Sequence, residues 1–287
     1  MSKKEIKPMH VKYETLSDIK FKEAAGIPRA LYELLVACLA QKRREQHKKG
    51  GRNPDLCVRD ELLMTLKYYR DYPTFFSLGL IFDLNKSNVQ RSIVKVENLI
   101  FDVFEAIMRI TVQSEQINIE GDKLTFDEKI VDVTECTIQR PKNKEVQLLY
   151  YSGKKKKHTI KMQIIIEETT GKIVSIAFDA GSVHDFSLFK KTTKDLDNLI
   201  AFLADSGYQG IDKIFEQSLT PKKKSKLHPL TDQDKDLNHL ISSIRISIEH
   251  VNSQLKIFRL LSERYRSKIK TFSLRAIIIC YFYNYCL

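Results

Sequence analysis

Residues 159–178 read TIKMQIIIEETTGKIVSIAF, and this stretch determines the expected fold. Two runs rich in Ile, Val and Phe, Thr159–Ile166 and Lys172–Phe178, flank the short turn Thr169–Gly171. β-Branched and aromatic residues favour strands, and a short turn containing Gly favours an antiparallel hairpin. The stretch therefore predicts two hydrogen-bonded strands of one sheet.

Further elements of the same domain are expected on both sides of this hairpin. Lys129–Val133 and Leu199–Ala204 have a similar composition and predict two more strands, while Asp185–Leu196 is expected to be a helix. From Leu237 onward the pattern is helical to the end of the sequence. Its apolar residues are spaced four, three, four and three apart: Ile244, Ile248, Val251, Leu255 and Phe258. The order of elements predicts an α/β (α+β) domain with a mixed sheet.

Residues 1 to about 115 read almost entirely as helix. Three apolar stripes follow the helical period: Leu62, Leu66 and Tyr69; Phe75, Leu78 and Phe82; and Val89, Ile93, Val96 and Ile100. Only Asp83–Lys86 separates the last two stripes, and Ser87 can cap the third helix. This is the spacing of a helix-turn-helix at about 58–100, and a plain three-helix bundle is the alternative.

The third helix of this group has a polar face that fits DNA. It presents Asn88, Gln90, Arg91 and Lys95. Such side chains can reach base edges or phosphates from a helix in the major groove. The sequence thus predicts a helical DNA-binding domain over residues 1–115 and a second domain over residues 124–287.

The charge balance indicates a polyanionic partner. Lys and Arg number 48 against 36 Asp and Glu, which gives a net charge of +12 and a pI near 9.3. A surplus of this size favours nucleic acid because binding releases condensed counterions. A ribosomal or merely soluble basic protein has the same balance, so charge alone leaves the class of protein open.

Other compositional features exclude several classes of protein. No apolar run reaches the length of a membrane span, and Ala276–Leu287 is expected to be a buried terminal helix. No secretory signal is expected at the N-terminus. The five cysteines contain no CxxC pair, so spacing indicates neither a zinc site nor a disulfide framework. A reducing cytosol or nucleus fits this cysteine usage.

Three carboxylates fall at positions suited to metal binding. Asp132 lies in the predicted strand Lys129–Val133, Asp205 directly follows Leu199–Ala204, and Glu249 is helical. Hard divalent cations need charged oxygen ligands held on rigid elements. Alternatively, Asp132 and Asp205 could be ordinary turn or strand-end residues, and Arg245 with Glu249 an ordinary surface pair. Spacing alone does not decide between a metal site and these alternatives.

At these residues the sequence resembles the DDE-type transposases of bacterial insertion sequences and the related Harbinger group. The matching blocks, in order, are Val131–Glu135 leading into Gln139–Pro141, Tyr151–Lys155 with His158 and Thr159, Gly181–Asp185, Leu203–Gly210, and Arg245–His250. The likeness extends more loosely to the helix-turn-helix. It covers roughly two-thirds of the chain or more.

The resemblance implies a ribonuclease-H-like catalytic core over residues 124–287. Asp132, Asp205 and Glu249 would then be the catalytic carboxylates and would hold two Mg²⁺ or Mn²⁺ ions. The implied activity is cleavage of phosphodiester bonds at the ends of a mobile element and joining of the 3′-hydroxyl ends to target DNA. Val133 stands where the family usually has Gly, next to the first carboxylate.

Several other residues have expected supporting roles. Lys154, Lys155, Lys156 and Lys157 form a basic loop expected to hold backbone phosphates, as Arg245 also could. Asp185 is expected to cap a helix or to support the site through a hydrogen bond. No catalytic role is expected for His158.

The expected partners are double-stranded DNA at the element ends and the target, with a possible homo-oligomer in the active complex and no membrane. The expected location is the bacterial nucleoid in the cytoplasm, or the nucleus of a eukaryotic host. Two alternatives remain open at this stage. One is a domesticated or inactive DNA-binding relative, and the other is a simple nuclease of the same fold.

Overall fold

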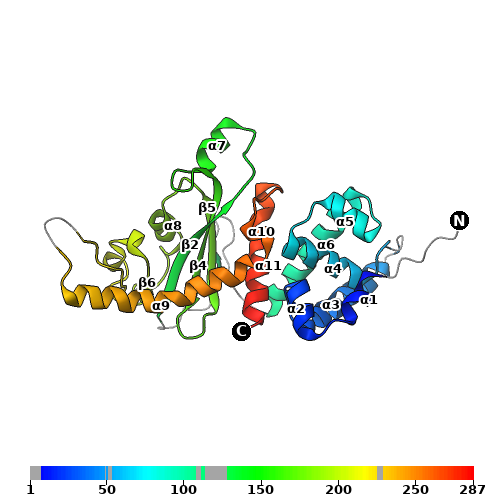
Figure 1. Ribbon diagram of the computed structural model, residues 1–287, viewed down its shortest axis with the longest axis horizontal. Coiled ribbons are helices and arrows are strands. Elements are labelled where there is room, and N and C mark those ends of the chain that lie inside the picture. The colour runs from blue at the N-terminus through cyan, green and yellow to red at the C-terminus, as the bar shows by residue number, and fades with distance from the viewer. Residues whose placement is uncertain (1–7, 49, 51–53, 108–110, 114–127, 225–228) are drawn as a thin grey trace. The chain divides into compact units, whose positions relative to one another are not determined.

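The computed structural model describes residues 8–48, 50, 54–107, 111–113, 128–224 and 229–287 (Figure 1). The chain divides into two compact units. The first comprises residues 1–108, 256–263 and 274–287, and the second comprises residues 109–255 and 264–273. Within the described residues, no helix has both the length and the apolar character needed to cross a membrane.

The first unit is helical. Its elements are α1 (Met9–Glu14), α2 (Asp18–Ala25), α3 (Arg29–His47), α4 (Val58–Asp71), α5 (Phe75–Phe82), α6 (Lys86–Ile107), α10 (Arg259–Ser262) and most of α11 (Phe272–Tyr285). The three predicted stripes lie on α4, α5 and α6, and each of their residues is buried except Phe75, which is partly exposed. The predicted N-terminal helices are therefore confirmed.

The turn between α5 and α6 has a tight geometry that depends on one glycine. The Leu84 amide donates to the Gly79 carbonyl at 2.9 Å, and a Cβ on Gly79 would collide with the Leu84 carbonyl oxygen. The expected cap, Ser87, lies inside the helix. Asn85 takes that role because its Oδ1 accepts from the Asn88 amide at 2.9 Å.

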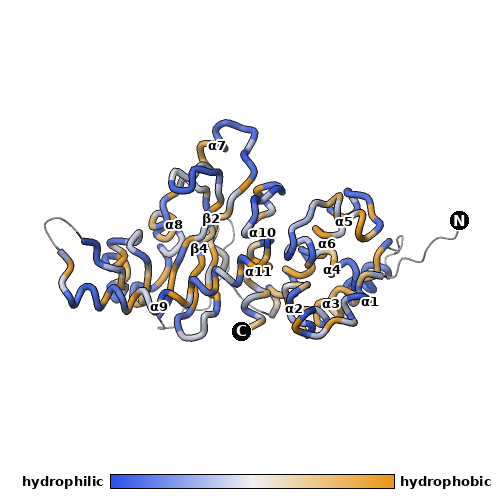
Figure 2. Tube along the Cα trace, viewed as in Figure 1, coloured by the Kyte–Doolittle hydropathy of each residue, from blue (hydrophilic) through white to orange (hydrophobic). Residues whose placement is uncertain are grey.

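The C-terminal helix joins the first unit, although the sequence pattern predicted a single second domain over residues 124–287. As predicted, the run that begins at Ala276 is helical and buried, including Ile278, Ile279, Cys280 and Phe282. Apolar residues are concentrated along α11 and along the central strands (Figure 2). A helix that is apolar on all sides must be enclosed by other elements, so α11 packs within the helical unit.

The second unit is built on a mixed sheet. Its strands are β1 (Thr111–Gln113), β2 (Lys129–Thr137), β3 (Tyr151–Ser152), β4 (Lys157–Glu167), β5 (Ile173–Ala180) and β6 (Phe202–Leu203). The order is β1-β5-β4-β2-β6, with β3 paired to β4. The β2/β4 and β4/β5 pairs are antiparallel, whereas β6 runs parallel to β2. The expected ribonuclease-H-like mixed sheet and the α/β (α+β) class are confirmed.

Several boundaries differ from those expected. Of the strand predicted at Leu199–Ala204, only β6 forms. Ile200 and Ala204 are buried like strand residues but are not paired with β2. Strand β1 pairs with β5 although it lies within the stretch expected to be helical. The remaining elements of the unit are α7 (Lys144–Tyr150), α8 (Asp185–Thr192), the 3-10 helices Ser206–Tyr208, Ile211–Lys213 and Ile269–Thr271, and α9 (Asp232–Lys256).

An aromatic cluster covers one face of this sheet. Val131 of β2 packs there with Phe189 of α8, Phe202 of β6 and Phe215. The rings of Phe202 and Phe215 lie 4.8 Å apart, and those of Phe189 and Phe202 lie 5.0 Å apart. Each such ring contributes roughly 1.5–3 kcal/mol through burial. The cluster fixes β6 beside β2, and side chains at alternate positions of β2 point to the opposite face.

A buried ion pair ties α11 to α6. Arg275 Nε donates to Glu97 Oε1 at 2.7 Å, and both side chains are almost fully buried. The pKa of the Glu97 carboxyl is raised chiefly by burial, while the Arg275 guanidinium lowers it. Tyr68 and Tyr69 add hydrogen bonds at 3.1 and 3.3 Å. The pair is therefore closely surrounded by protein.

We predict that Arg275→Leu destabilises the protein by about 3–5 kcal/mol, because it leaves the Glu97 carboxylate buried without its countercharge. Denaturation by urea measures the loss. Lys42→Ala is the matched control, since its pair with Asp102 is exposed and should contribute less than about 1 kcal/mol. Equal effects of the two substitutions would contradict this account.

Candidate active site

Strand register places the first two predicted carboxylates at the same level. Lys129 and Ile130 of β2 pair with Phe202 and Leu203 of β6 in parallel. Asp132 lies two residues beyond Ile130, and Asp205 lies two residues beyond Leu203. Neighbouring strands are about 4.8 Å apart, and a step of two residues returns to the same face. The two carboxylates therefore face one site from adjacent strands.

Each carboxylate is held locally. The nine residues of β2 pair with β4 without a break, so the backbone around Asp132 is regular. Val133 packs against the aromatic cluster on the other face of the sheet. A valine at this position thus leaves the strand geometry intact. Asp205 Oδ1 accepts the Gly207 amide at 2.7 Å at the start of a 3-10 helix.

Helix α9 supplies the polar contacts of Asp132. Asn252 Nδ2 donates to Asp132 Oδ2 at 2.9 Å, and Arg245 Nη2 lies 3.6 Å from Asp132 Oδ1. Asn252 was recognisable in the sequence only as a member of the polar stripe that contains Arg245 and Glu249, and no role was inferred for it. The structure shows that it holds the first carboxylate by a direct hydrogen bond.

Glu249 occupies the same stripe but is not joined to the two aspartates. Spacing of four and three residues places Arg245, Glu249 and Asn252 along one side of α9. The Glu249 side chain is exposed. No hydrogen bond or ion pair links it to another residue that the structure describes. The structure therefore brings Asp132 and Asp205 together and leaves Glu249 at the exposed edge of the site.

The electrostatics of the site reflect crowded negative charge. The pKa of the Asp132 carboxyl is raised to about 6, first because burial penalises its charged form. Arg245 lowers this pKa, whereas the charges of Asp205 and Asp185 raise it. Three carboxylates thus lie close enough to influence one another, and Arg245 offsets only part of the rise in the pKa of Asp132.

Tyr208 lies beside these carboxylates and was not anticipated from the sequence. Its pKa is raised well above the usual value, first by burial and then by the charges of Asp185, Asp132 and Asp205. Its hydroxyl is buried and has no hydrogen-bond partner among the described residues. The block ADSGYQG contains this tyrosine, but nothing in its spacing marks the hydroxyl as part of the site.

Asp185 is an ion-pair partner rather than a helix cap. The N-cap of α8 is His184, and Asp185 is the first residue of the helix. Its Oδ1 lies 2.5 Å from Nζ of Lys161, which is buried on β4. Of the two roles expected for Asp185, the structure thus excludes N-capping and shows a charged contact near the site.

The predicted DNA contacts lie on exposed segments. Lys154–Lys157 are all exposed, the first three in the turn that joins β3 to β4 and Lys157 at the start of β4, and they form no ion pair with the described residues. On α6, Gln90 and Arg91 are exposed, whereas Asn88 and Lys95 are partly buried. Arg91 Nη2 donates to Asn88 Oδ1 at 2.7 Å, so these two side chains are already oriented toward each other.

Comparison with known proteins identifies the family. The sequence matches the family described as "DDE superfamily endonuclease" over residues 131–284, and its "helix-turn-helix" over residues 54–106. It is also similar to a protein of Microchaete diplosiphon described as a probable transposase for insertion sequence element IS702. The two are 36% identical over 280 residues, which is 96% of each chain. The chain belongs to the DDE superfamily of endonucleases.

The DDE endonuclease match covers Asp132, Asp205 and Glu249, and the helix-turn-helix match covers α4, α5 and α6. The helix-turn-helix expected from the apolar stripes is thereby confirmed. The endonuclease match extends into α11 and therefore includes residues from both compact units.

Enzymes of the DDE endonuclease superfamily generally use divalent metal ions. The donor set fits such an ion, because carboxylate oxygens are the ligands that hard divalent cations prefer. Burial first, and then the charges of Asp205 and Asp185, raise the pKa of Asp132, and a bound cation would favour its charged form. The residues present are therefore suited to a divalent ion.

Proposed function

We propose that this DDE endonuclease is a DNA transposase that cuts at the ends of its mobile element and joins the freed 3′ ends to target DNA. The placement of Asp132 on β2 and of Asp205 just after the adjacent parallel strand β6 carries the proposal, with Glu249 on the polar stripe of α9. The similarity to the probable IS702 transposase over nearly the whole chain supports it.

Asp132, Asp205 and Glu249 would hold two Mg²⁺ or Mn²⁺ ions. Such a pair activates a hydroxyl nucleophile and stabilises the leaving oxygen of an in-line displacement at phosphorus. Glu249 can turn toward the aspartates because its side chain is exposed and bonds to no other described residue. Two carboxylates fixed by the sheet and one adaptable carboxylate suit a site that must accept DNA.

The neighbouring residues would orient these ligands. Asn252 holds one oxygen of Asp132 with a hydrogen bond, which leaves the other oxygen beside Arg245. Arg245 could also contact a phosphate through its guanidinium, which lies beside Asp132. The Lys161–Asp185 pair keeps a third carboxylate compensated at the edge of the site.

Cleavage and joining would share one chemical scheme. In cleavage, a water oxygen attacks the scissile phosphorus, the bond to the 3′ oxygen breaks, and that oxygen leaves as a 3′-hydroxyl. In joining, this 3′-hydroxyl attacks a target phosphorus and displaces the target's own 3′ oxygen. The number of phosphodiester bonds is conserved in the second step, so joining needs no external energy source.

The proposed partners are double-stranded DNA at the element ends and at the target. The helix-turn-helix would bind end DNA, and Lys154–Lys157 would hold backbone phosphates near the carboxylates. A homo-oligomer would allow both ends to be processed in one complex. Action on chromosomal DNA would take place in the nucleoid, or in the nucleus of a eukaryotic host.

Asp132→Asn, Asp205→Asn and Glu249→Gln should each lower end cleavage, and joining of pre-cut 3′-hydroxyl ends to target DNA, by about a thousandfold or more. Each change removes a charged ligand but little DNA contact, so DNA binding should be nearly unchanged. Labelled element ends incubated with a target plasmid measure both steps.

The matched control for these variants is Asp236→Asn, an exposed carboxylate near the start of α9. Wild-type rates in any one of the three variants would remove that residue from the site. Cleavage by the wild-type protein without any joining would instead indicate a simple nuclease, and binding without cleavage would indicate an inactive DNA-binding relative.

A second prediction concerns the helix-turn-helix. Arg91→Ala and Lys95→Ala should weaken binding to element-end DNA, while changes at Asn88 or Gln90 should relax sequence preference, because phosphate contacts set affinity and base contacts specify. Competition binding with end and random DNA measures both effects. Lys20→Ala removes an equal, exposed charge from α2 and should have little effect. Unchanged binding by the α6 variants would exclude this helix from the DNA interface.

The basic turn gives a third prediction. A variant with Lys154, Lys155 and Lys157 changed to Ala and Lys156 to Gly should bind all DNA sequences more weakly. Lys156 has φ of 54°, so Gly keeps the turn unstrained. The plot of log affinity against log salt should become shallower by roughly 0.9 for each phosphate that the turn no longer neutralises. Lys235→Ala is the control, because the Lys235 ammonium already pairs with Asp232. If the turn variant gave a slope as steep as this control, the turn would serve only solubility.

A further inference from the structure

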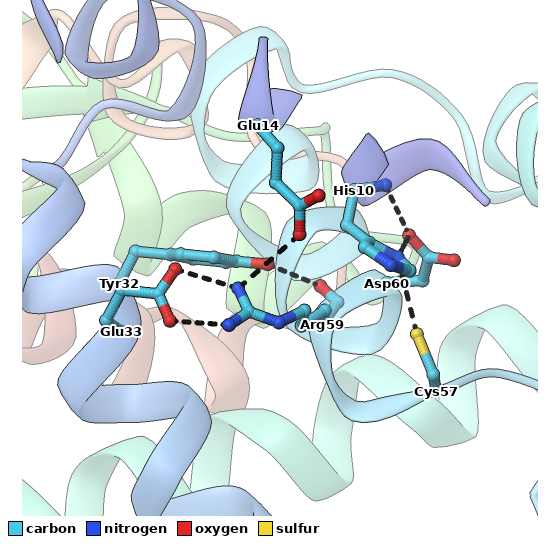
Figure 3. A network of polar contacts seen from close by, with 7 residues as sticks. All are labelled: His10, Glu14, Tyr32, Glu33, Cys57, Arg59 and Asp60. Carbon is cyan, nitrogen blue, oxygen red and sulfur yellow. Dashed lines mark hydrogen bonds and ion pairs between the residues drawn. The ribbon is translucent and has the colours of Figure 1, made fainter. Parts of the chain in front are cut away.

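A second cluster of potential metal ligands lies in the helical unit and includes no residue assigned to catalysis or DNA binding. It consists of His10 on α1, Cys57 immediately before α4, and Asp60 in the first turn of α4. One ligand atom from each residue lies within 4.8 Å of the other two. Figure 3 shows the Cys57 thiol and the Asp60 carboxylate both in contact with His10. Within the described residues it is the one group of three or more His, Cys, Asp and Glu with this proximity.

Two of the three ligand-to-ligand distances are close to the edges of a tetrahedral metal site. Zinc binds sulfur at about 2.3 Å and nitrogen or oxygen at about 2.0–2.2 Å, so adjacent sulfur and nitrogen ligands lie about 3.5 Å apart and adjacent nitrogen and oxygen ligands about 3.4 Å apart. Cys57 Sγ lies 3.5 Å from His10 Nδ1, and His10 Nδ1 lies 3.1 Å from Asp60 Oδ1. An ion could therefore enter with only small adjustments.

The surroundings hold the ligands in place. The His10 amide donates to Asp60 Oδ1 at 2.7 Å, and Asp60 is only 5% exposed. The adjacent Arg59 guanidinium would oppose a cation, but both of its terminal nitrogens lie 2.7 Å from Glu33 oxygens, and Glu14 is 4.0 Å away (Figure 3). The positive charge of this neighbouring arginine is thus already compensated.

The chemistry of the donors selects the type of metal. A thiolate and an imidazole favour Zn²⁺ and similar transition metals, whereas Mg²⁺ and Ca²⁺ prefer oxygen ligands alone. The negative charges of a Cys57 thiolate and Asp60 would balance a divalent ion. Cys57 is exposed, which leaves a fourth position open to water.

We propose that His10, Cys57 and Asp60 form a binding site for a thiophilic divalent metal ion of the Zn²⁺ type. The bound ion would fasten α1 to the first turn of α4, the first helix of the matched helix-turn-helix. The site depends on local geometry alone and is independent of the proposed transposase activity. Cysteine spacing could not reveal it, because His10 and Cys57 are distant in sequence and no CxxC pair is involved.

Titration of the reduced full-length protein with Co²⁺ tests the site. Binding of one equivalent should produce a thiolate-to-cobalt charge-transfer band in the near ultraviolet, together with the visible bands of a tetrahedral ion. Zn²⁺ should remove these bands, and a large excess of Mg²⁺ should not. The charge-transfer band reports sulfur ligation, so ions bound to the carboxylates of the second unit do not contribute to it.

Two variants and one control identify the residues that produce the charge-transfer band. Cys57→Ser should abolish it and should still fold, since serine is a favoured N-cap residue. His10→Gln should weaken Co²⁺ binding at least tenfold. Losing a residue that merely hydrogen-bonds to a metal ligand already lowers metal affinity by about tenfold, and His10 is itself a proposed ligand. Cys286→Ser, which changes an exposed cysteine outside the cluster, should leave it unchanged. The absence of the band in the wild type, or its persistence in Cys57→Ser, would overturn the proposal.

Discussion

The parallel pairing of β2 with β6 is the constraint on which the candidate active site depends. Only Lys129 and Ile130 pair with Phe202 and Leu203, yet this short contact sets Asp132 level with Asp205. The aromatic cluster behind β2 stabilises the pairing, because Phe202 is buried there against Phe189 and Phe215. A shift of one residue would turn one carboxylate to the opposite face of the sheet. The aromatic cluster buried on one face of the sheet thus fixes the positions of Asp132 and Asp205 on the other face.

Much of the fold was predictable because burial leaves a periodic pattern. The three stripes of the helix-turn-helix repeat at the helical period, the hairpin at 159–178 is two apolar runs around a short turn, and α11 is a continuous apolar run; all three are confirmed. Where the pattern is short, prediction was less accurate. Strand β1 has only three residues, and β6 has two within a longer buried segment. The partner strand, rather than composition, defines such elements.

The site itself was predictable in part. Asp132, Asp205 and Glu249 were candidates from the elements they lie on or follow, and the family resemblance, not spacing, selected them. The sequence cannot show that Glu249 is exposed while Asn252 contacts Asp132. These details depend on how α9 is rotated against the sheet. For a similar reason the sequence did not reveal the cluster of His10, Cys57 and Asp60, which combines two segments that are distant along the chain.

The central claim is that Asp132, Asp205 and Glu249 hold the same metal ions. Fe²⁺ bound in place of Mg²⁺, with ascorbate and hydrogen peroxide, generates hydroxyl radicals that cut the backbone close to the ion. The experiment is best performed on the Cys57→Ser protein, so that the proposed second site does not contribute. The account predicts cuts beside Asp132, beside Asp205 and near Glu249 in α9, all suppressed by excess Mg²⁺. Cuts at the two aspartates that leave α9 intact would contradict it.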